Sequence, residues 1–204
     1  MITLRAVTKR LGDGVVLDGL DLDLPDGRVT ALMGPNGSGK TTVGRLLLGL
    51  AMPDAGTIQG LDGRRRAAVF QEDRLCEHLT AVDNVRLVLD RATRASAVVA
   101  ELSRVGLDRG SLVKPVRELS GGQRRRVAIV QALMAEADLI VLDEPFKGLD
   151  TESRSLVMDY ARERSDGRTT LLITHDRAEA ERFGARVVEL SRPARPGGCA
   201  GPDA

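Results

Sequence analysis

Cysteine is scarce in this chain of 204 residues, which contains only Cys76 and Cys199. Two cysteines so far apart cannot form the disulfide framework of a small secreted protein. Neither stands in a Cys-x-x-Cys or similar metal-binding spacing. We therefore expect a reducing compartment, of which the cytosol is the simplest case.

The chain has no large surplus of either charge. Lysine and arginine number 30, against 29 for aspartate and glutamate, so the formal net charge is +1. This balance argues against a protein that binds nucleic acid by bulk electrostatic attraction, and we expect no nucleic-acid partner. Arginine supplies nearly all of the positive charge. Lysine is so rare that one inside a motif is conspicuous, and the four lysines are Lys9, Lys40, Lys114 and Lys147.

Long apolar segments are missing too. The longest apolar runs, such as 46–48, are far shorter than the roughly 20 residues that cross a bilayer. Residues 1–5 lack the basic start and apolar centre of a secretory signal. We find no internal repeat and no sustained heptad pattern. A soluble chain is expected, which can still bind to a membrane protein.

The pattern of apolar residues predicts an α/β fold. Residues 2–8 and 15–24 alternate apolar and polar side chains, which is typical of half-buried antiparallel strands. Short apolar runs then alternate with helical segments, as in a mostly parallel sheet covered on both faces. The predicted strands of that sheet include 28–33, 138–145, 169–176 and 185–190, and the helices 41–50, 121–135 and 152–164.

We interpret residues 1–191 as a single domain. Residues 79–107 follow a helical pattern without a strand signal, which predicts a helical subdomain over about 75–135. Residues 192–204 are dominated by proline, glycine and alanine, and such a segment buries too little apolar surface to order itself. We therefore predict a flexible tail there.

A glycine-rich stretch joins the strand predicted at 28–33 to the next helix. Its sequence "GPNGSGKT" over 34–41 has the spacing of a phosphate-binding P-loop. Glycine lets successive N–H groups turn inward around phosphate oxygens, and the following helix adds the positive end of its dipole. Lys40 is expected at the β- and γ-phosphates and the Thr41 hydroxyl on Mg²⁺. The residues assigned to nucleotide binding here are Gly34, Pro35, Asn36, Gly37, Ser38, Gly39, Lys40, Thr41 and Thr42.

Two carboxylates follow the apolar run of "LIVLDEP" over 139–145. Open α/β sheets bind their ligands at the carboxyl ends of such strands. Because the same chain has a P-loop, we interpret Asp143 as a Mg²⁺ ligand and Glu144 as the residue that orients and deprotonates water. ATP and Mg²⁺ are the predicted cofactors.

A third motif carries a resemblance to a family. "LSGGQ" over 119–123 is the signature of ATP-binding cassette (ABC) ATPases, and residues 2–190 resemble one nucleotide-binding domain of that family. The resemblance implies that Gln71 in "VFQED" contacts Mg²⁺ and the water. It likewise implies that His175 in "LLITHD" contacts the γ-phosphate and that Asp150 in "GLD" belongs to the site. The signature residues implied to bind the γ-phosphate of a second subunit are Ser120, Gly121, Gly122 and Gln123.

The signature also implies partners. Ser120 can cap a helix that starts at Gly121, which leaves N–H groups at a positive helix end, a ready anion site. One chain carries one P-loop and one signature, so two chains are expected head to tail, as a homodimer or a heterodimer. The resemblance implies integral membrane subunits, contacted through residues 75–85, at the cytoplasmic face of the membrane. "DEPFKGLD" resembles importers more than exporters, which adds an extracytoplasmic solute-binding protein.

One residue departs from the pattern of the family, and two runs of arginine have no role that we infer from the sequence. Leu11 stands where the family usually has an aromatic residue that stacks on adenine, and leucine lacks the aromatic face. Residues 64–66 are three arginines, which we interpret as a solvated turn. Residues 124–126 are also arginines, of the kind that similar proteins carry at the start of the signature helix.

Two other classes of protein share part of this set of motifs. A soluble ABC ATPase acting on DNA would carry long coiled coils between P-loop and signature, and one acting on ribosomes would carry two cassettes. A nucleotide-gated regulatory subunit would be expected to lack Glu144 or His175, and both are present.

Overall fold

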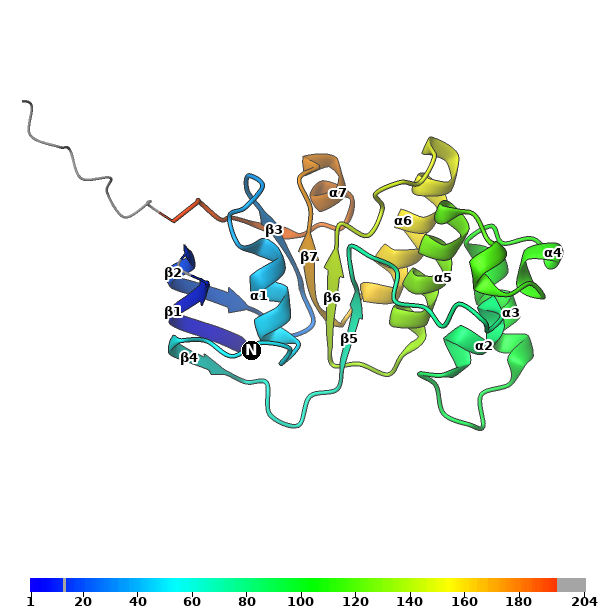
Figure 1. The fold of residues 1–204 in the computed structure, drawn as a ribbon, viewed down its shortest axis with the longest axis horizontal. Coiled ribbons are helices and arrows are strands. Elements are labelled where there is room, and N and C mark those ends of the chain that lie inside the picture. The colour runs from blue at the N-terminus through cyan, green and yellow to red at the C-terminus, as the bar shows by residue number, and fades with distance from the viewer. Residues whose placement is uncertain (13, 194–204) are drawn as a thin grey trace, which may run out of the picture.

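The computed structural model describes residues 1–12 and 14–193. Figure 1 shows an antiparallel sheet at one end, a parallel sheet in the middle and an arm of helices at the other end. The expected fold class, with its antiparallel and helical parts, is therefore confirmed. The predicted tail lies, from residue 194 on, outside the described residues.

The parallel sheet has five strands in the order β5-β6-β7-β3-β8. Every residue of β6 and β7 is buried, because helices cover both faces of the sheet. Neighbouring strands all run parallel, so their carboxyl ends meet at one edge. The strands are β3 (Val29–Met33), β5 (Arg66–Val69), β6 (Leu139–Asp143), β7 (Thr169–Ile173) and β8 (Arg186–Glu189).

The antiparallel sheet has the order β2-β1-β4. In its central strand, Leu4 pairs with Leu22 on one side and with Ile58 on the other. The alternating apolar residues of this sheet pack on α1, whose Leu46 and Leu47 belong to the same core as β6 and β7. The strands are β1 (Ile2–Leu11), β2 (Gly14–Leu24) and β4 (Ala55–Gln59).

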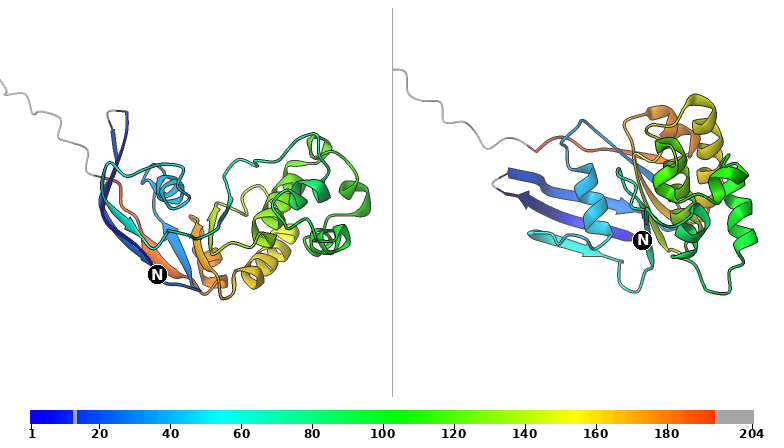
Figure 2. Two further views of the ribbon diagram at one scale, coloured as in Figure 1. Left: turned by 90° about the horizontal axis from the view of Figure 1, so that it is seen from below. Right: turned by 45° about the vertical axis from the view of Figure 1, so that its right-hand side comes forward.

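A second core joins the helical arm to the other face of the parallel sheet. It contains Val85 of α2, Leu102 of α3, Ile129 of α5 and Val157 of α6. Figures 1 and 2 show α5 between the rest of the arm and the sheet. The helices are α1 (Lys40–Leu47), α2 (Ala81–Arg86), α3 (Ala95–Arg104), α4 (Arg109–Leu112), α5 (Gly121–Met134), α6 (Thr151–Ser165) and α7 (Arg177–Arg182), with a 3-10 turn at Val116–Glu118.

The helical pattern predicted over 79–107 is divided between two helices. A turn over 87–94 separates α2 from α3. In it, the Asp90 carboxylate accepts a hydrogen bond from the N–H of Ala92 at 2.7 Å, and the Asp90 carbonyl accepts one from Thr93 at 2.9 Å. Aspartate favours such turns because its side chain bonds the backbone two residues on.

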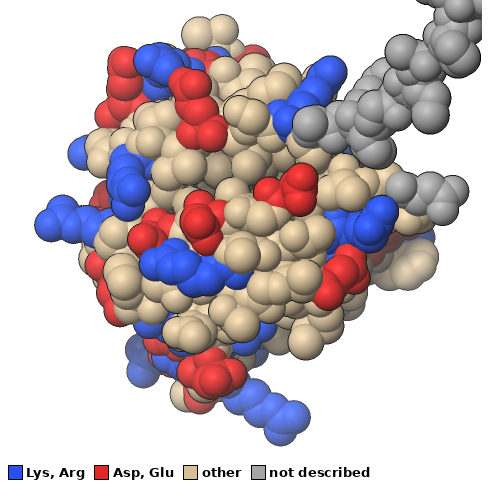
Figure 3. Space-filling model, turned by 90° about the vertical axis from the view of Figure 1, so that its left-hand side faces the viewer, with Lys and Arg blue, Asp and Glu red and all other residues tan. Residues whose placement is uncertain are grey.

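The surface of the antiparallel end carries both charges. Figure 3 shows acidic and basic side chains interspersed among uncharged ones over this face, as the net charge of +1 leads one to expect. No helix in the described ranges is both long and apolar enough to span a bilayer.

Candidate nucleotide-binding site

The P-loop connects β3 to α1, and two of its glycines lie against the backbone of other strands or of the segments that follow them. Gly34 has a φ of 144°, and a Cβ there would lie 2.2 Å from the carbonyl oxygen of Leu190. Gly39 precedes α1 with a φ of 94°, and its Cβ would lie 2.8 Å from the carbonyl oxygen of Val16. Only glycine fits both positions, because the backbone conformation and the close approach each disfavour a side chain.

Two basic side chains fix the shape of the loop. The Lys40 ammonium is largely buried and donates to the carbonyls of Gly34 at 2.8 Å and Pro35 at 2.9 Å. Arg192, which follows β8, donates to the carbonyl of Asn36 from Nε at 3.0 Å and Nη2 at 2.8 Å. Charged donors make stronger hydrogen bonds than neutral ones. The loop is therefore preorganised by contacts within this chain.

A hollow of about 420 Å³ opens beside the P-loop at the carboxyl edge of the parallel sheet. It brings together segments that are far apart in the sequence, and it includes most of the predicted P-loop residues. Gly34, Pro35 and Ser38 are not among its lining residues. The carbonyls of Gly34 and Pro35 accept hydrogen bonds from Lys40, and Ser38 lines a different cavity. The residues that line the hollow are Val16, Asn36, Gly37, Gly39, Lys40, Thr41, Thr42, Gln71, Asp143, Glu144, Lys147 and Ile173.

Three groups in this hollow fit a magnesium ion. The Thr41 hydroxyl, the Gln71 amide and the Asp143 carboxylate all line it. Burial raises the pKa of the Asp143 carboxyl, and a hydrogen bond from Thr41 opposes that shift. A buried carboxylate of this kind gains from a nearby cation. Such oxygen donors suit Mg²⁺, which usually completes its coordination with water and phosphate oxygens.

Glu144 stands on a strained turn at the end of β6. Its φ is 44°, a conformation that costs a non-glycine residue about 1–3 kcal/mol. Burial works against ionisation of its carboxyl, but Lys147, whose ammonium lies 3.3 Å away, and His175 outweigh burial. The pKa of Glu144 therefore lies below its ordinary value. At neutral pH this side chain is a carboxylate that can accept a hydrogen bond from water.

His175 borders the nucleotide hollow without lining it. It lies in an adjoining hollow of about 260 Å³ that shares Glu144 and Lys147 with the first. Its Nδ1 is 3.4 Å from Oε1 of Glu144. Lys147 was not assigned to the site from the sequence. Two features of the sequence could have indicated a role for it: it stands three residues after Glu144, and the chain has only four lysines.

The signature residues begin α5 as predicted. The Ser120 hydroxyl accepts from the N–H of Gln123 at 3.2 Å, and the Gln123 side chain accepts from the N–H of Ser120 at 2.9 Å, which is a capping box. Gly121 is exposed and Gly122 half-buried. None of these residues is among those described as lining the P-loop hollow. Figures 1 and 2 show the start of α5 on the helical arm, across the parallel sheet from α1.

Asp150 and Leu11 lie outside both hollows. The Asp150 carboxylate caps α6 and accepts from the N–H of Ser153 at 2.9 Å. Leu11 ends β1 and is 53% exposed, whereas Val16 of β2 lines the nucleotide hollow. The roles inferred for Asp150 and Leu11 stay predictions.

The model of the ABC transporter family matches residues 17–147. The match begins in β2, contains the P-loop and the signature, and covers more than half of the chain. The chain belongs to the ABC transporter family. The resemblance inferred from the sequence is thus confirmed.

Relatives of this ABC cassette differ from it in length. The aliphatic sulfonates import ATP-binding protein of Nocardia farcinica is 40% identical, over 94% of this chain and 78% of its own length. The Fe(3+) ions import ATP-binding protein of Mesorhizobium japonicum is 39% identical, over 93% of this chain and 57% of its own length. The Nod factor export ATP-binding protein of Cupriavidus metallidurans is 38% identical, over 90% of this chain and 65% of its own length.

A solved structure with the same fold is a dimeric ATP-binding cassette in a post-hydrolysis state, bound to ADP and Pi. Its TM-score to this chain is 0.82 at 28% identity, and the match covers 93% of this chain and 94% of that one. The fold and the ATPase activity expected from the sequence are confirmed. The chain is an ATP-binding, ATP-hydrolysing cassette.

Leu11→Tyr is expected to tighten ATP binding. A phenol ring at this position of the β1–β2 hairpin can stack on the adenine, which contributes on the order of 1 kcal/mol, or about fivefold in Kd. Arg10→Tyr is the matched control, because adjacent strand residues point to opposite faces. Calorimetry with ATP measures both. An unchanged or weaker Kd for Leu11→Tyr would remove Leu11 from the base site.

Proposed function

We propose that this cassette powers the import of a solute across a membrane, as a head-to-tail dimer at the cytoplasmic face. The similarity to import ATP-binding proteins supports import, and the separation of two half-sites within one chain supports the dimer. The P-loop hollow lies beside the parallel sheet, whereas the signature at Ser120 begins a helix of the arm. A second chain, identical or homologous, would bring its own signature to the phosphates.

In the proposed reaction, water attacks the γ-phosphate of ATP to give ADP and inorganic phosphate. The P-loop N–H groups and Lys40 bind the phosphates, and the Glu144 carboxylate orients the water and takes its proton. His175, beside Glu144, holds the γ-phosphate. Mg²⁺, when bound by Thr41, Gln71 and Asp143, supplies positive charge that offsets the charge of the phosphates.

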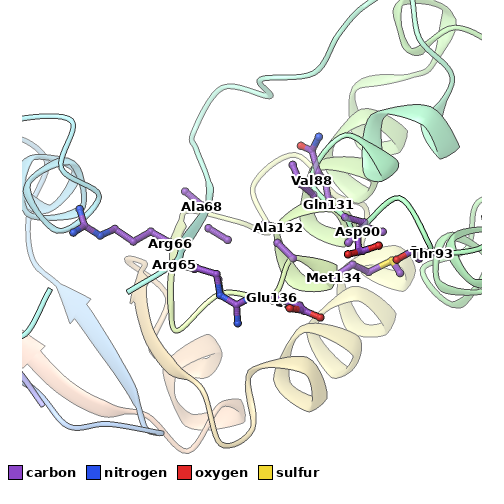
Figure 4. A pocket seen from close by; sticks show the side chains of 14 residues that line it. Arg65, Arg66, Ala68, Val88, Asp90, Thr93, Gln131, Ala132, Met134 and Glu136 are labelled. Carbon is purple, nitrogen blue, oxygen red and sulfur yellow. Dashed lines mark hydrogen bonds and ion pairs between the residues drawn. The ribbon is translucent and has the colours of Figure 1, made fainter. Parts of the chain in front are cut away.

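The groove between the parallel sheet and the helical arm is the proposed contact with the membrane subunits. A hollow of about 610 Å³ lies there. Figure 4 shows Arg65 on one wall, with Val88 and Met134 on the other. Leu87, next in the chain to Val88, is 59% exposed. The groove thus offers both charged and apolar surface to a partner. Its lining residues between Val88 and Thr93 follow closely in the sequence on the stretch 75–85, which is predicted to dock.

Glu77→Lys is expected to uncouple transport from hydrolysis. Glu77 is exposed in the predicted docking stretch and lines neither nucleotide hollow. Reversing its charge should leave the ATPase rate of the isolated cassette unchanged and weaken solute uptake in vesicles that contain the complete transporter. Glu181→Lys, at an exposed position of α7, is the control and should change neither rate. Equal loss of both activities in Glu77→Lys would contradict a docking role.

Affinity purification of the tagged chain from native membranes tests the proposed function. We expect membrane-spanning subunits to co-purify in a fixed ratio to the cassette, together with a solute-binding protein. Recovery of DNA-binding or ribosomal proteins instead would favour the soluble alternative.

A further inference from the structure

Arg125, near the start of α5, is buried, although the arginine run to which it belongs received no function from the sequence. Its exposure is 4%, whereas Arg124 and Arg126 on either side are partly exposed. A guanidinium stays charged in proteins and carries five N–H donors, so it is rarely buried without partners. The partners of Arg125 come from two other segments of the nucleotide site.

One set of partners lies at the end of β6. Nε donates to the carbonyl of Pro145 at 2.8 Å, and Nη2 donates to the carbonyls of Asp143 at 3.1 Å and Glu144 at 2.6 Å. These are three consecutive backbone carbonyls around the proposed catalytic carboxylate. The fork of the guanidinium therefore fixes the turn that carries Glu144.

The other set lies on either side of Gln71. Nη1 of Arg125 donates to the carbonyl of Phe70, and it pairs with the Asp73 carboxylate at 3.1 Å. Only 19% of the Asp73 side chain is exposed. Solvent therefore screens the attraction between Arg125 and Asp73 less than it screens an exposed ion pair. The segment that holds Gln71 is therefore fixed to the same side chain as Glu144.

Backbone strain at Glu144 makes this support necessary. A non-glycine residue at a φ of 44° persists only where its surroundings hold it. The N–H of Glu144 donates to the carbonyl of Ile173 at 2.9 Å, and its carbonyl accepts from Arg125. Both sides of the strained residue are thus held, one by β7 and the other by the helix that begins with the signature.

We propose that Arg125 is a positioning residue for ATP hydrolysis, which sets Gln71 and Glu144 relative to each other and to the signature helix. The inference rests on the proposed roles of Gln71 and Glu144. Arg125 contacts neither the P-loop nor Lys40, so its loss should leave ATP binding nearly unchanged. It contacts the segments that carry Gln71 and Glu144, so its loss should misplace the attacking water. The expected signature is a fall in kcat at a nearly constant Kd for ATP.

Arg125→Met tests this prediction. We expect kcat to fall by about tenfold or more, since small misplacements of catalytic groups have effects of this size and larger. The Kd for ATP, measured by calorimetry, should stay within about threefold of the wild-type value. Arg125→Lys keeps the charge but loses the planar fork, so it should recover part of kcat.

Arg168 offers a matched control at the opposite end of α5. Its guanidinium is half-buried and also donates to several carbonyls, from Nη1 to Leu133 at 2.8 Å and from Nη2 to Ala135 at 2.6 Å. It lines neither nucleotide hollow. Arg168→Met should therefore lower the melting temperature and leave kcat per folded molecule unchanged. If Arg125→Met does not fold, the same comparison of kcat and Kd for ATP is made between Arg125→Lys and Arg168→Lys.

The outcomes separate this inference from the proposed function. If Glu144→Gln abolishes hydrolysis and kcat of Arg125→Met equals that of Arg168→Met, the positioning role alone is wrong. A loss of ATP affinity in parallel with kcat would also overturn it, because that result indicates general damage to the site. If Glu144→Gln retains full activity, the proposed function itself fails at its catalytic step.

Discussion

Glu144→Gln is expected to lower kcat for ATP hydrolysis by about a hundredfold or more and to leave ATP binding intact. Glutamine keeps the size and hydrogen-bonding capacity of the side chain but does not take a proton from water. The contacts of Lys40 and the P-loop with phosphate are unchanged. Phosphate release at steady state measures the first effect, and calorimetry with ATP measures the second.

The same variant should accumulate as a dimer with ATP and Mg²⁺ on a sizing column, because a closed dimer that does not hydrolyse reopens only by slow ATP release. Adding Ser120→Arg should prevent the shift, since it places bulk where the phosphate docks. Ser103→Arg, on the exposed face of α3, is the control. ADP lacks the γ-phosphate and should support a weaker dimer. Brisk hydrolysis by Glu144→Gln would remove Glu144 from the catalytic role.

Lys40→Ala is expected to abolish measurable ATP binding. The phosphates lose their main cation, and charged hydrogen bonds of this kind are worth about 1.5–3 kcal/mol each. The substitution also frees the carbonyls of Gly34 and Pro35, which the ammonium holds at 2.8 and 2.9 Å. The loss of preorganisation adds to the loss of charge.

Calorimetry with ATP compares Lys40→Ala with Lys114→Ala, a lysine on the exposed surface of the helical arm. The control should bind ATP as the wild-type chain does. If Lys40→Ala also binds with wild-type affinity, the P-loop does not hold the phosphates in the manner inferred. A melting curve in the absence of nucleotide shows whether the variant is folded.

Local motifs made much of this site predictable. The P-loop spacing and the carboxylates after β6 each depend on a few consecutive residues, so their identity and order are visible in the sequence. The capping box at Ser120 is predictable for the same reason, because Ser120 and Gln123 are three residues apart. The parallel sheet then brings its strand ends together.

The rest of the site depends on contacts between distant segments. Arg125 has the same sequence signal as Arg124, and only the position of Phe70 and Glu144 shows that its guanidinium is buried. Val16 lines the hollow, whereas the family resemblance points to Leu11 as the residue beside the adenine. Which residue of a hairpin reaches the site depends on the twist of the antiparallel sheet, which composition does not report.

The order of the parallel sheet has a consequence for synthesis on the ribosome. β3 leads into the P-loop, yet both of its neighbours, β7 and β8, come from the last part of the domain. In a nascent chain both edges of this strand are unpaired until β7 has emerged, and the second edge stays unpaired until β8 follows. The N–H of Leu190 then donates to the carbonyl of Met33 at 2.7 Å. Such late, long-range pairing slows folding. Because a ligand stabilises only the state that binds it, we expect ATP to stabilise chains that include β7 and β8 more than chains that end before them.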